Sequence, residues 1–369
     1  MLSVATAAVV LASAALGSAQ AVTGTYPPVP LASKGPYAYP SGIPYKVDTD
    51  VGLVRGTQLG YNICNSTTEN QQSLCQTSWL NSIDDFCLWA PAEPGHNVGD
   101  IEGSMIAWCT KPGHGTRLIP SGALTGVQFM KTPDYVQVVG FFDQTKVNMI
   151  AGDYGGEMDP HGADLRGNPM GGILYSDKFT GSPVQAIEWH NFIGSNAFCL
   201  KACDPAGKDA KHYCEHIYDR IGCAYNAPNA ARDLVFESCD GDNQDFPGVY
   251  TAANGTTMTY HQPPESLGPI TTIEYTARVP ASSNCQTFSS AAIYTGLPTV
   301  AATTTSAAAT TGAGATTSGP KVTGTTTTSK STTGTAGASQ TTNTTSGASS
   351  LTISVFSVAC VVLSAFVFA

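Results

Sequence analysis

The chain has 369 residues, with 27 acidic residues against 17 Lys and Arg, and its formal net charge at pH 7 is −10. All 27 acids lie between residues 22 and 298, a range long enough for one large or two ordinary domains. This balance makes nucleic acid a poor partner, and the lack of a G-x-x-x-x-G-K-[ST] loop argues against a nucleotide enzyme.

Residues 1–21 have the pattern of a secretory signal peptide. A continuous apolar run extends from Val4 to Leu16, and small residues that suit signal peptidase follow it. The run is shorter than the roughly 20 apolar residues that a bilayer span needs. We therefore expect export, with cleavage after Ala19 or Ala21.

Residues 22–63 form a segment rich in Pro, Gly and Tyr. Six prolines between positions 27 and 44 require an extended, irregular backbone. We expect this segment to wrap around the rest of the protein as an arm, with Tyr37, Tyr39 and Tyr45 on its surface.

Residues 64–298 should form the globular core, either as one unit or as two subdomains, 64–180 and 181–298. Ten of the eleven cysteines lie in this core, and an even number in an exported chain predicts disulfides. They fall into two groups: Cys64, Cys75, Cys87 and Cys109, then Cys199, Cys203, Cys214, Cys223, Cys239 and Cys285. Pairing within the groups gives two bridges in the first and three in the second.

A zinc site is the alternative use of the second group. Cys199, Cys203 and Cys214 lie near His212 and His216 in the sequence. Disulfides consume thiolates in an oxidising compartment, so we disfavour this zinc site.

Several short segments of the core have strand patterns. Three of them, 127–131, 135–139 and 147–150, carry β-branched and aromatic residues between turn signals and predict a meander. Further strands are expected in 105–109, 184–192, 234–238 and 270–278.

Helical spacing is clearest from Asp209 to Gly222, where Cys214 should face inward, and weaker from Asn70 to Phe86. We therefore predict a β-rich, disulfide-bonded domain with a few short helices. Its pattern does not separate a sandwich from an irregular α+β fold.

The chain after the core has the composition of a stalk. In residues 299–350, 28 of the 52 positions are Ser or Thr, with no aromatic or acidic residue, so this segment cannot build a core. Secretion and Thr density favour a disordered, O-glycosylated stalk over residues 299–346; an unmodified linker is the alternative.

The chain ends in an apolar stretch from Leu351 to Ala369 with no basic residue after it. A single-pass helix normally keeps Lys or Arg on its cytoplasmic flank, whereas a GPI signal ends in a hydrophobic tail that is removed. We expect residues 347–369 to be such a signal, with the lipid attached at Ser346 or at the upstream alternatives Asn343 and Gly337.

Three Asn-x-Ser/Thr sequences predict N-glycosylation, at Asn65, Asn254 and Asn343. Asn65 directly follows Cys64, which hinders modification, so Asn254 is the stronger site.

Five longer motifs have an individual character that composition does not explain. They are 87–91 (CLWAP), 108–120 (WCTKPGHGTRLIP), 155–169 (GGEMDPHGADLRGNP), 220–231 (RIGCAYNAPNAA) and 241–250 (GDNQDFPGVY). Over residues 54–287 the chain resembles the fungal secreted macrophage-activating glycoproteins. The resemblance implies a fungal source, a signal peptide and a Ser/Thr-rich tail with a GPI signal, and it assigns no catalytic residue.

The strongest candidate for chemistry is the acidic loop, which we define as residues 151–172. It places charged side chains among seven glycines and two prolines: Asp153, Glu157, Asp159, His161, Asp164 and Arg166. Such carboxylates can bind calcium or act as the acid and nucleophile of a glycoside hydrolase. The favoured interpretation is a solvated loop whose acids cap turns.

Other catalytic patterns are weak. Residues 240–245 resemble the start of a calcium loop, but Asp245 replaces the expected glycine and Thr251 the expected Glu. The chain lacks a G-x-S-x-G elbow, and none of His114, His161, His190 and His261 has an evident partner.

We assign no catalytic residue, cofactor or metal, and keep calcium as an alternative. Trp89 and Trp108, beside cysteines, should be core residues. The sequence favours a GPI-anchored glycoprotein of the fungal surface or wall that contacts wall glycans or other surface molecules. The alternative is a wall-polysaccharide hydrolase or a glycan-binding module that uses the acidic loop.

Overall fold

The structure, a computed structural model, describes residues 29–51 and 55–294. The signal peptide, the stalk, the GPI signal, Ser346 and Asn343 lie outside these residues. Within them, no helix is both long and apolar enough to cross a membrane.

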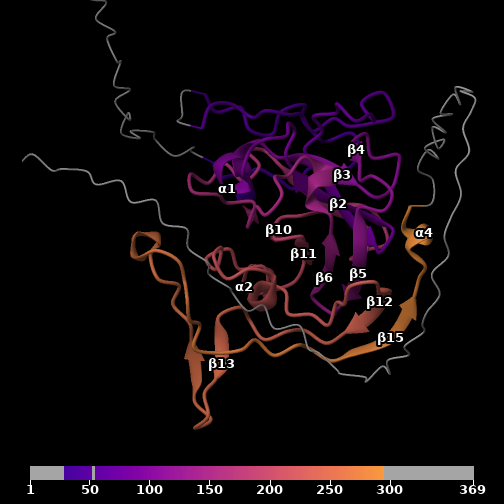
Figure 1. Ribbon diagram of the computed structural model, residues 1–369. Helices are drawn as coiled ribbons and strands as arrows, with labels where there is room; N and C mark the ends of the chain where they lie inside the picture. Colours follow the sequence, from indigo (N-terminus) through magenta and orange to yellow (C-terminus); the bar gives the residue numbers. More distant parts are fainter. Residues whose placement is uncertain (1–28, 52–54, 295–369) are drawn as a thin grey trace, which may run out of the picture. The chain divides into compact units, whose positions relative to one another are not determined.

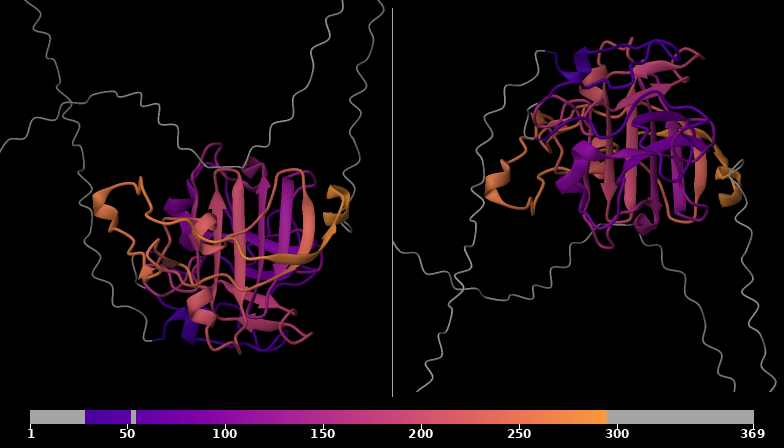
Figure 2. Two further views of the ribbon diagram at one scale, coloured as in Figure 1. Left: turned by 90° about the horizontal axis from the view of Figure 1, so that it is seen from below. Right: turned by 90° about the horizontal axis from the view of Figure 1, so that it is seen from above.

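Two mixed β-sheets form the framework of the described residues (Figure 1). The smaller sheet has the order β4-β3-β2-β1-β8-β9, with strands β1 (Thr77–Ser82), β2 (Asp85–Ala90), β3 (Ile106–Cys109), β4 (Arg117–Leu118), β8 (Ile173–Ser176) and β9 (Val184–Ala186). The larger has the order β15-β12-β5-β6-β11-β10-β7, with β5 (Leu124–Lys131), β6 (Tyr135–Phe142), β7 (Gly156–Met158), β10 (Trp189–Gly194), β11 (Ala197–Cys203), β12 (Phe236–Gly241) and β15 (Ser282–Thr287). Figure 2 shows the strands of this larger sheet side by side.

The remaining elements are short. A hairpin joins β13 (Val249–Thr251) to β14 (Thr257–Thr259). The helices are α1 (Val98–Ile101), α2 (Ala210–Tyr213), α3 (Cys223–Asn226) and α4 (Ser290–Ile293), with 3-10 turns η1 (Leu31–Ser33), η2 (Glu102–Ser104), η3 (Gln144–Val147) and η4 (Glu265–Leu267). The prediction of a β-rich domain with a few short helices is confirmed.

The two sheets pack face to face around one apolar core, so the arrangement is a sandwich. Phe86 and Leu88 of the smaller sheet lie in the same buried cluster as Val138 and Phe198 of the larger. The larger sheet contains strands that precede residue 180 and strands that follow it. The alternative of two subdomains divided at residue 180 therefore does not correspond to the two sheets.

The outer face of the larger sheet is covered as well. Val136 and Val138 of β6 face the central core, whereas Val139 packs with Phe192 and Cys199 in a second cluster. A strand buried on both faces is apolar along its length instead of alternating, which explains the strong β6 pattern.

Five disulfides join all ten core cysteines, and each stays within its group as predicted. They are Cys64–Cys75, Cys87–Cys109, Cys199–Cys223, Cys203–Cys214 and Cys239–Cys285. Cys199–Cys223 and Cys203–Cys214 fasten the segment that follows β11 to this strand, and Cys239–Cys285 joins the neighbouring strands β12 and β15.

The arm packs on the smaller sheet, as expected for a wrapping segment. Leu31 and Val47 share a buried cluster with Trp79 and Tyr175. Tyr37 is partly buried, while Tyr39 and Tyr45 are exposed.

The helix predicted for residues 70–86 is wrong, because this segment contains β1 and the start of β2. Neighbouring residues of β1 face opposite sides of the sheet, and both sides are buried: Leu80 lies in the central core and Trp79 under the arm. Burial on both faces produced an apolar spacing that imitates a helix.

The longer helix predicted over 209–222 is reduced to the four residues of α2. Cys214 faces inward as predicted, but its bond to Cys203 anchors the chain to β11, and Ile217 is exposed. Tertiary attachment therefore overrides the local helical spacing.

Two predicted strands are also absent from the described residues. In the predicted strand 147–150, Val147 ends the 3-10 turn η3 and Asn148 adopts a left-handed backbone, so the neighbour of β6 in the sheet is β11 instead. Residues 270–278 contain no strand; Ile270 and Ile273 pack on a cluster around Tyr275. The segment 184–192 divides between β9 and β10, which belong to different sheets.

Candidate functional site

Two acids of the acidic loop serve the structure. Asp153 accepts hydrogen bonds from the amides of Val98 (2.8 Å) and Gly155 (2.9 Å), which ties α1 to the loop. Asp164 binds the guanidinium of Arg55 through its Nε (3.0 Å). Both carboxylates are thus engaged by groups of the protein itself.

Glu157 and Asp159 instead line a cavity of about 670 Å³. The other titratable residues around it come from distant segments of the chain: Glu102, His216, Asp219, Arg220 and Glu265. Five carboxyl groups thus share one cavity, which favours neutral or cationic ligands over anions.

Glu157 has the most unusual environment of these acids. Its side chain is only 3% exposed, and neither carboxyl oxygen has a hydrogen-bond partner among the described residues. Burial, reinforced by the charges of Asp159 and Asp219, raises its pKa well above the usual value. Burial therefore favours the neutral form of Glu157, and a protonated carboxyl group can donate one hydrogen bond and accept others.

Glu102 lies beside Glu157 and titrates near neutrality. Its two oxygens accept hydrogen bonds from the Glu157 amide (3.1 Å) and from Asn168 Nδ2 (2.9 Å). Burial is the main cause that raises the pKa of Glu102 to about 7. A Cβ atom at position 156 would overlap Glu102 Oε1. Glycine at this position therefore allows the Glu102 carboxyl group to approach the backbone of β7.

Asp159 caps the turn that follows β7. Its Oδ1 accepts hydrogen bonds from the amides of His161 (2.6 Å) and Gly162 (2.7 Å). The predicted turn capping is therefore present, but Asp153, Glu157 and Asp159 are buried and not solvated.

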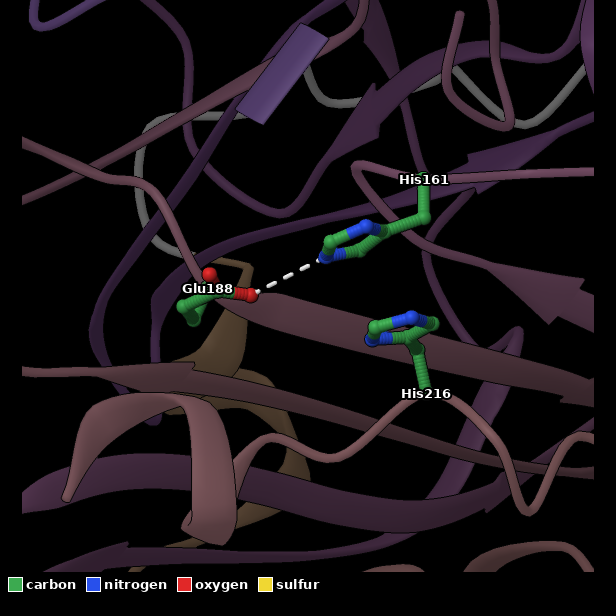
Figure 3. Close-up of side chains that lie close together, drawn as sticks. All are labelled: His161, Glu188 and His216. Atoms are coloured by element: carbon green, nitrogen blue, oxygen red, sulfur yellow. Dashed lines mark hydrogen bonds and ion pairs between the residues drawn. The ribbon is translucent and has the colours of Figure 1, made fainter. Parts of the chain in front are cut away.

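Next to the cavity, His161 and His216 stack on each other beside Glu188 (Figure 3). His161 Nε2 lies 3.2 Å from Glu188 Oε2. Burial alone would lower the pKa of His161, but the Glu188 carboxylate raises it above the usual value. Burial and the positive charge of His161 lower the pKa of His216.

The other candidate residues are placed elsewhere. His114 binds Asp85, His190 is fully buried, and His261 is exposed. In the calcium-like segment, Asp240 accepts a hydrogen bond from Asn284 on β15, and Asp245 pairs with Arg278.

The cysteine zinc site is excluded, because Cys199, Cys203 and Cys214 are all in disulfides. The two candidate N-glycosylation asparagines that the structure describes, Asn65 and Asn254, are exposed in turns.

Sequence reasoning missed Glu102, Glu188 and Asp219, and it considered His216 only as a partner of cysteines. None of these residues lies in a motif that marks it as functional. They meet Glu157 and His161 only through the packing of distant segments.

Comparison with known proteins identifies two relatives from the fungus Mycosarcoma maydis. Appressorium protein ROW1 is 48% identical over 236 residues, which are 63% of this chain and 52% of the relative. Appressorium protein ROW2 is 43% identical over 218 residues, which are 58% of this chain and 73% of the relative. The chain thus spans about half the length of ROW1.

No family model matches the chain, and no solved structure matches it. The two relatives support the expected fungal origin, but they do not carry the name of the macrophage-activating glycoproteins. The chain belongs to the family of fungal appressorium proteins that includes ROW1 and ROW2.

Proposed function

We propose that this protein is an exported glycoprotein of the fungal cell surface that binds wall glycans in its acidic cavity. Five disulfides are typical of a chain that folds in an oxidising compartment. The relatives are named after the appressorium, and we place the action of this protein at the surface of such a cell. A Ser/Thr-rich stalk and a GPI anchor would hold the domain away from the membrane.

The anchor is tested by phase partitioning before and after digestion with a GPI-specific phospholipase. The protein should move from the detergent phase to the aqueous phase. Recovery of the peptide Leu351–Ala369 from mature protein would contradict the anchor.

The buried, unpartnered carboxyl group of Glu157 carries the proposal of glycan binding. A buried polar group without a partner costs about 1–3 kcal/mol, and the hydroxyl groups of a sugar would satisfy it. Glu102 and Asp219 line the same cavity and add acceptors for further hydroxyls. Tyr154, 91% exposed at the rim, offers an aromatic ring to an apolar sugar face.

A wall-modifying hydrolase is the second candidate, favoured by the pairing of Glu102 with Glu157. Burial raises the pKa of both carboxyl groups, that of Glu102 to about 7, and a raised carboxyl pKa of this kind is typical of the general acid of a glycosidase.

One experiment separates the two functions. The secreted protein is incubated with chitin, β-glucan and mannan, and both retention and newly released reducing ends are measured. Glu157→Leu should abolish retention because it removes every hydrogen bond of this group. Glu157→Gln should keep retention, because the amide still donates and accepts.

Exposed Glu93 supplies the control variant Glu93→Gln, which should behave as the wild type. Retention without sugar release supports a binding protein. Sugar release that disappears in Glu157→Gln would establish the hydrolase, and retention unchanged in Glu157→Leu would refute glycan binding in this cavity.

A further inference from the structure

We propose that His161, Glu188 and His216 bind one divalent transition-metal ion of the Zn²⁺ class, beside the cavity to which we assign glycan binding. Their potential donor atoms all lie within 4.8 Å of one another. Two imidazoles and one carboxylate form a donor set that zinc uses in proteins, usually with a fourth place for water or substrate.

The two imidazole rings lie close together. The ring centroids of His161 and His216 are 3.5 Å apart, with 10° between the ring planes. Because a metal ion lies in the plane of each imidazole that binds it, one ring must rotate about its side-chain torsions for both nitrogens to reach the same ion. In Figure 3 the ring nitrogen of His216 nearest Glu188 lies on the same side as the His161 nitrogen that contacts this carboxylate.

Backbone contacts hold each donor in place independently of an ion. The His161 carbonyl accepts a hydrogen bond from the Gly167 amide (2.9 Å), and the Glu188 carbonyl accepts one from the Cys203 amide (3.0 Å). Cys203 is also bridged to Cys214, two residues before His216. The same strand end therefore positions the backbone of both Glu188 and His216.

A neighbouring carboxylate can orient one of the imidazoles. Glu215 Oε1 accepts a hydrogen bond from the His216 amide (3.1 Å) and lies 3.7 Å from Nδ1 of the same residue.

The site is accessible from outside. The side chains of His161, Glu188 and His216 are 19%, 20% and 33% exposed. His216 also lines the acidic cavity, so the fourth coordination place can be taken by water or by a hydroxyl of a ligand there. A half-open site of this kind fits exchangeable binding better than a closed structural zinc.

The test is metal binding by the secreted full chain, prepared without a His tag and stripped with a chelator. We expect calorimetry with Zn²⁺ to give one ion per chain, and Co²⁺ to give the intense visible absorption of a tetrahedral complex. Zn²⁺ should also raise the melting temperature, because it binds the folded state.

His161→Ala and His216→Ala should each weaken Zn²⁺ binding by more than 10-fold, and Glu215→Gln by about 10-fold through the lost orienting contact. His261→Ala removes an exposed histidine and should change nothing. Because an alanine variant can misfold, Glu188→Gln is measured as well; it is nearly isosteric and should also weaken binding. Circular dichroism checks the fold of each variant.

Absence of saturable Zn²⁺ binding would overturn the proposal. Binding that survives in a folded His161→Ala/His216→Ala double variant would overturn it too, because the ion would then lie elsewhere.

Discussion

Trp89 on β2 and Trp189 on β10 stack with their ring centroids 4.2 Å apart, which joins the two sheets at the centre of the core. Both rings are almost fully buried. The Trp89 amide also donates a hydrogen bond to Asn191 Oδ1 of β10 (2.9 Å). The contact connects a strand of each sheet through side chains 100 residues apart in the sequence.

Trp89→Ala should therefore lower the free energy of unfolding by about 3–5 kcal/mol, the range for removing a large aromatic side chain from a core. Urea unfolding of the secreted protein measures it. Tyr154→Ala, at a position 91% exposed, is the control and should change stability by less than about 0.5 kcal/mol. Equal effects of the two substitutions would show that the Trp pair does not join the sheets.

A buried ion pair fastens the arm to the acidic loop. Arg166 Nη2 lies 2.6 Å from Asp48 Oδ2, and both side chains are inaccessible to solvent. Arg166→Met removes the buried partner of the Asp48 carboxylate, and Lys34, 3.2 Å from Asp48, offsets only part of this loss, so we expect destabilisation by about 3–5 kcal/mol.

The double variant Asp48→Asn/Arg166→Met should lose less stability than Arg166→Met, because it also removes the buried Asp48 charge that has lost its main partner. The coupling energy from the double-mutant cycle measures this interaction. Additive losses would contradict it.

The raised pKa of Glu102 predicts that the stability of the fold depends on pH. Its pKa is about 7 in the folded protein against 4.5 for the free side chain, so the folded state keeps a proton that the unfolded state releases between these values. The stabilisation that this bound proton gives the folded state is fully present below about pH 4.5. It is lost as the pH rises through 7, by at most about 3 kcal/mol.

Melting temperatures from pH 5 to 8 in a matched buffer series test the effect. Glu102→Gln should flatten the decline with rising pH, whereas Glu93→Gln should keep the wild-type slope. The same slope in Glu102→Gln would mean that Glu102 has an ordinary pKa.

The Cys87–Cys109 bridge links neighbouring positions of β2 and β3. Cys109→Ser should cost about 2–5 kcal/mol and reduce secretion. Cys360→Ser is the control and should secrete normally, since Cys360 lies in the tail that we expect to be removed. Peptide mapping without reduction should recover the five pairs, and a bridge between the two cysteine groups would contradict this connectivity.

The sequence alone was sufficient for features that depend on composition and local pattern. An even number of cysteines, in a chain that we expect to be exported, predicted disulfides within two groups, and the β-branched runs predicted β5 and β6. The local pattern gave a wrong prediction for β1, because burial on both faces makes this strand apolar at helix-like spacing. It also predicted too long a helix where the disulfide of Cys214 attaches the chain to β11.

The candidate sites were decided by tertiary structure. The acidic loop was recognisable from its residue types, but its chemistry depends on Glu102, which stands 55 residues before Glu157. His161, Glu188 and His216 come from three separate segments that meet only when β10 and β11 pack beside β7. Residue type fixes what a side chain can do, whereas burial and the neighbours brought by sheet packing set its pKa and its partners, and those are properties of the folded chain.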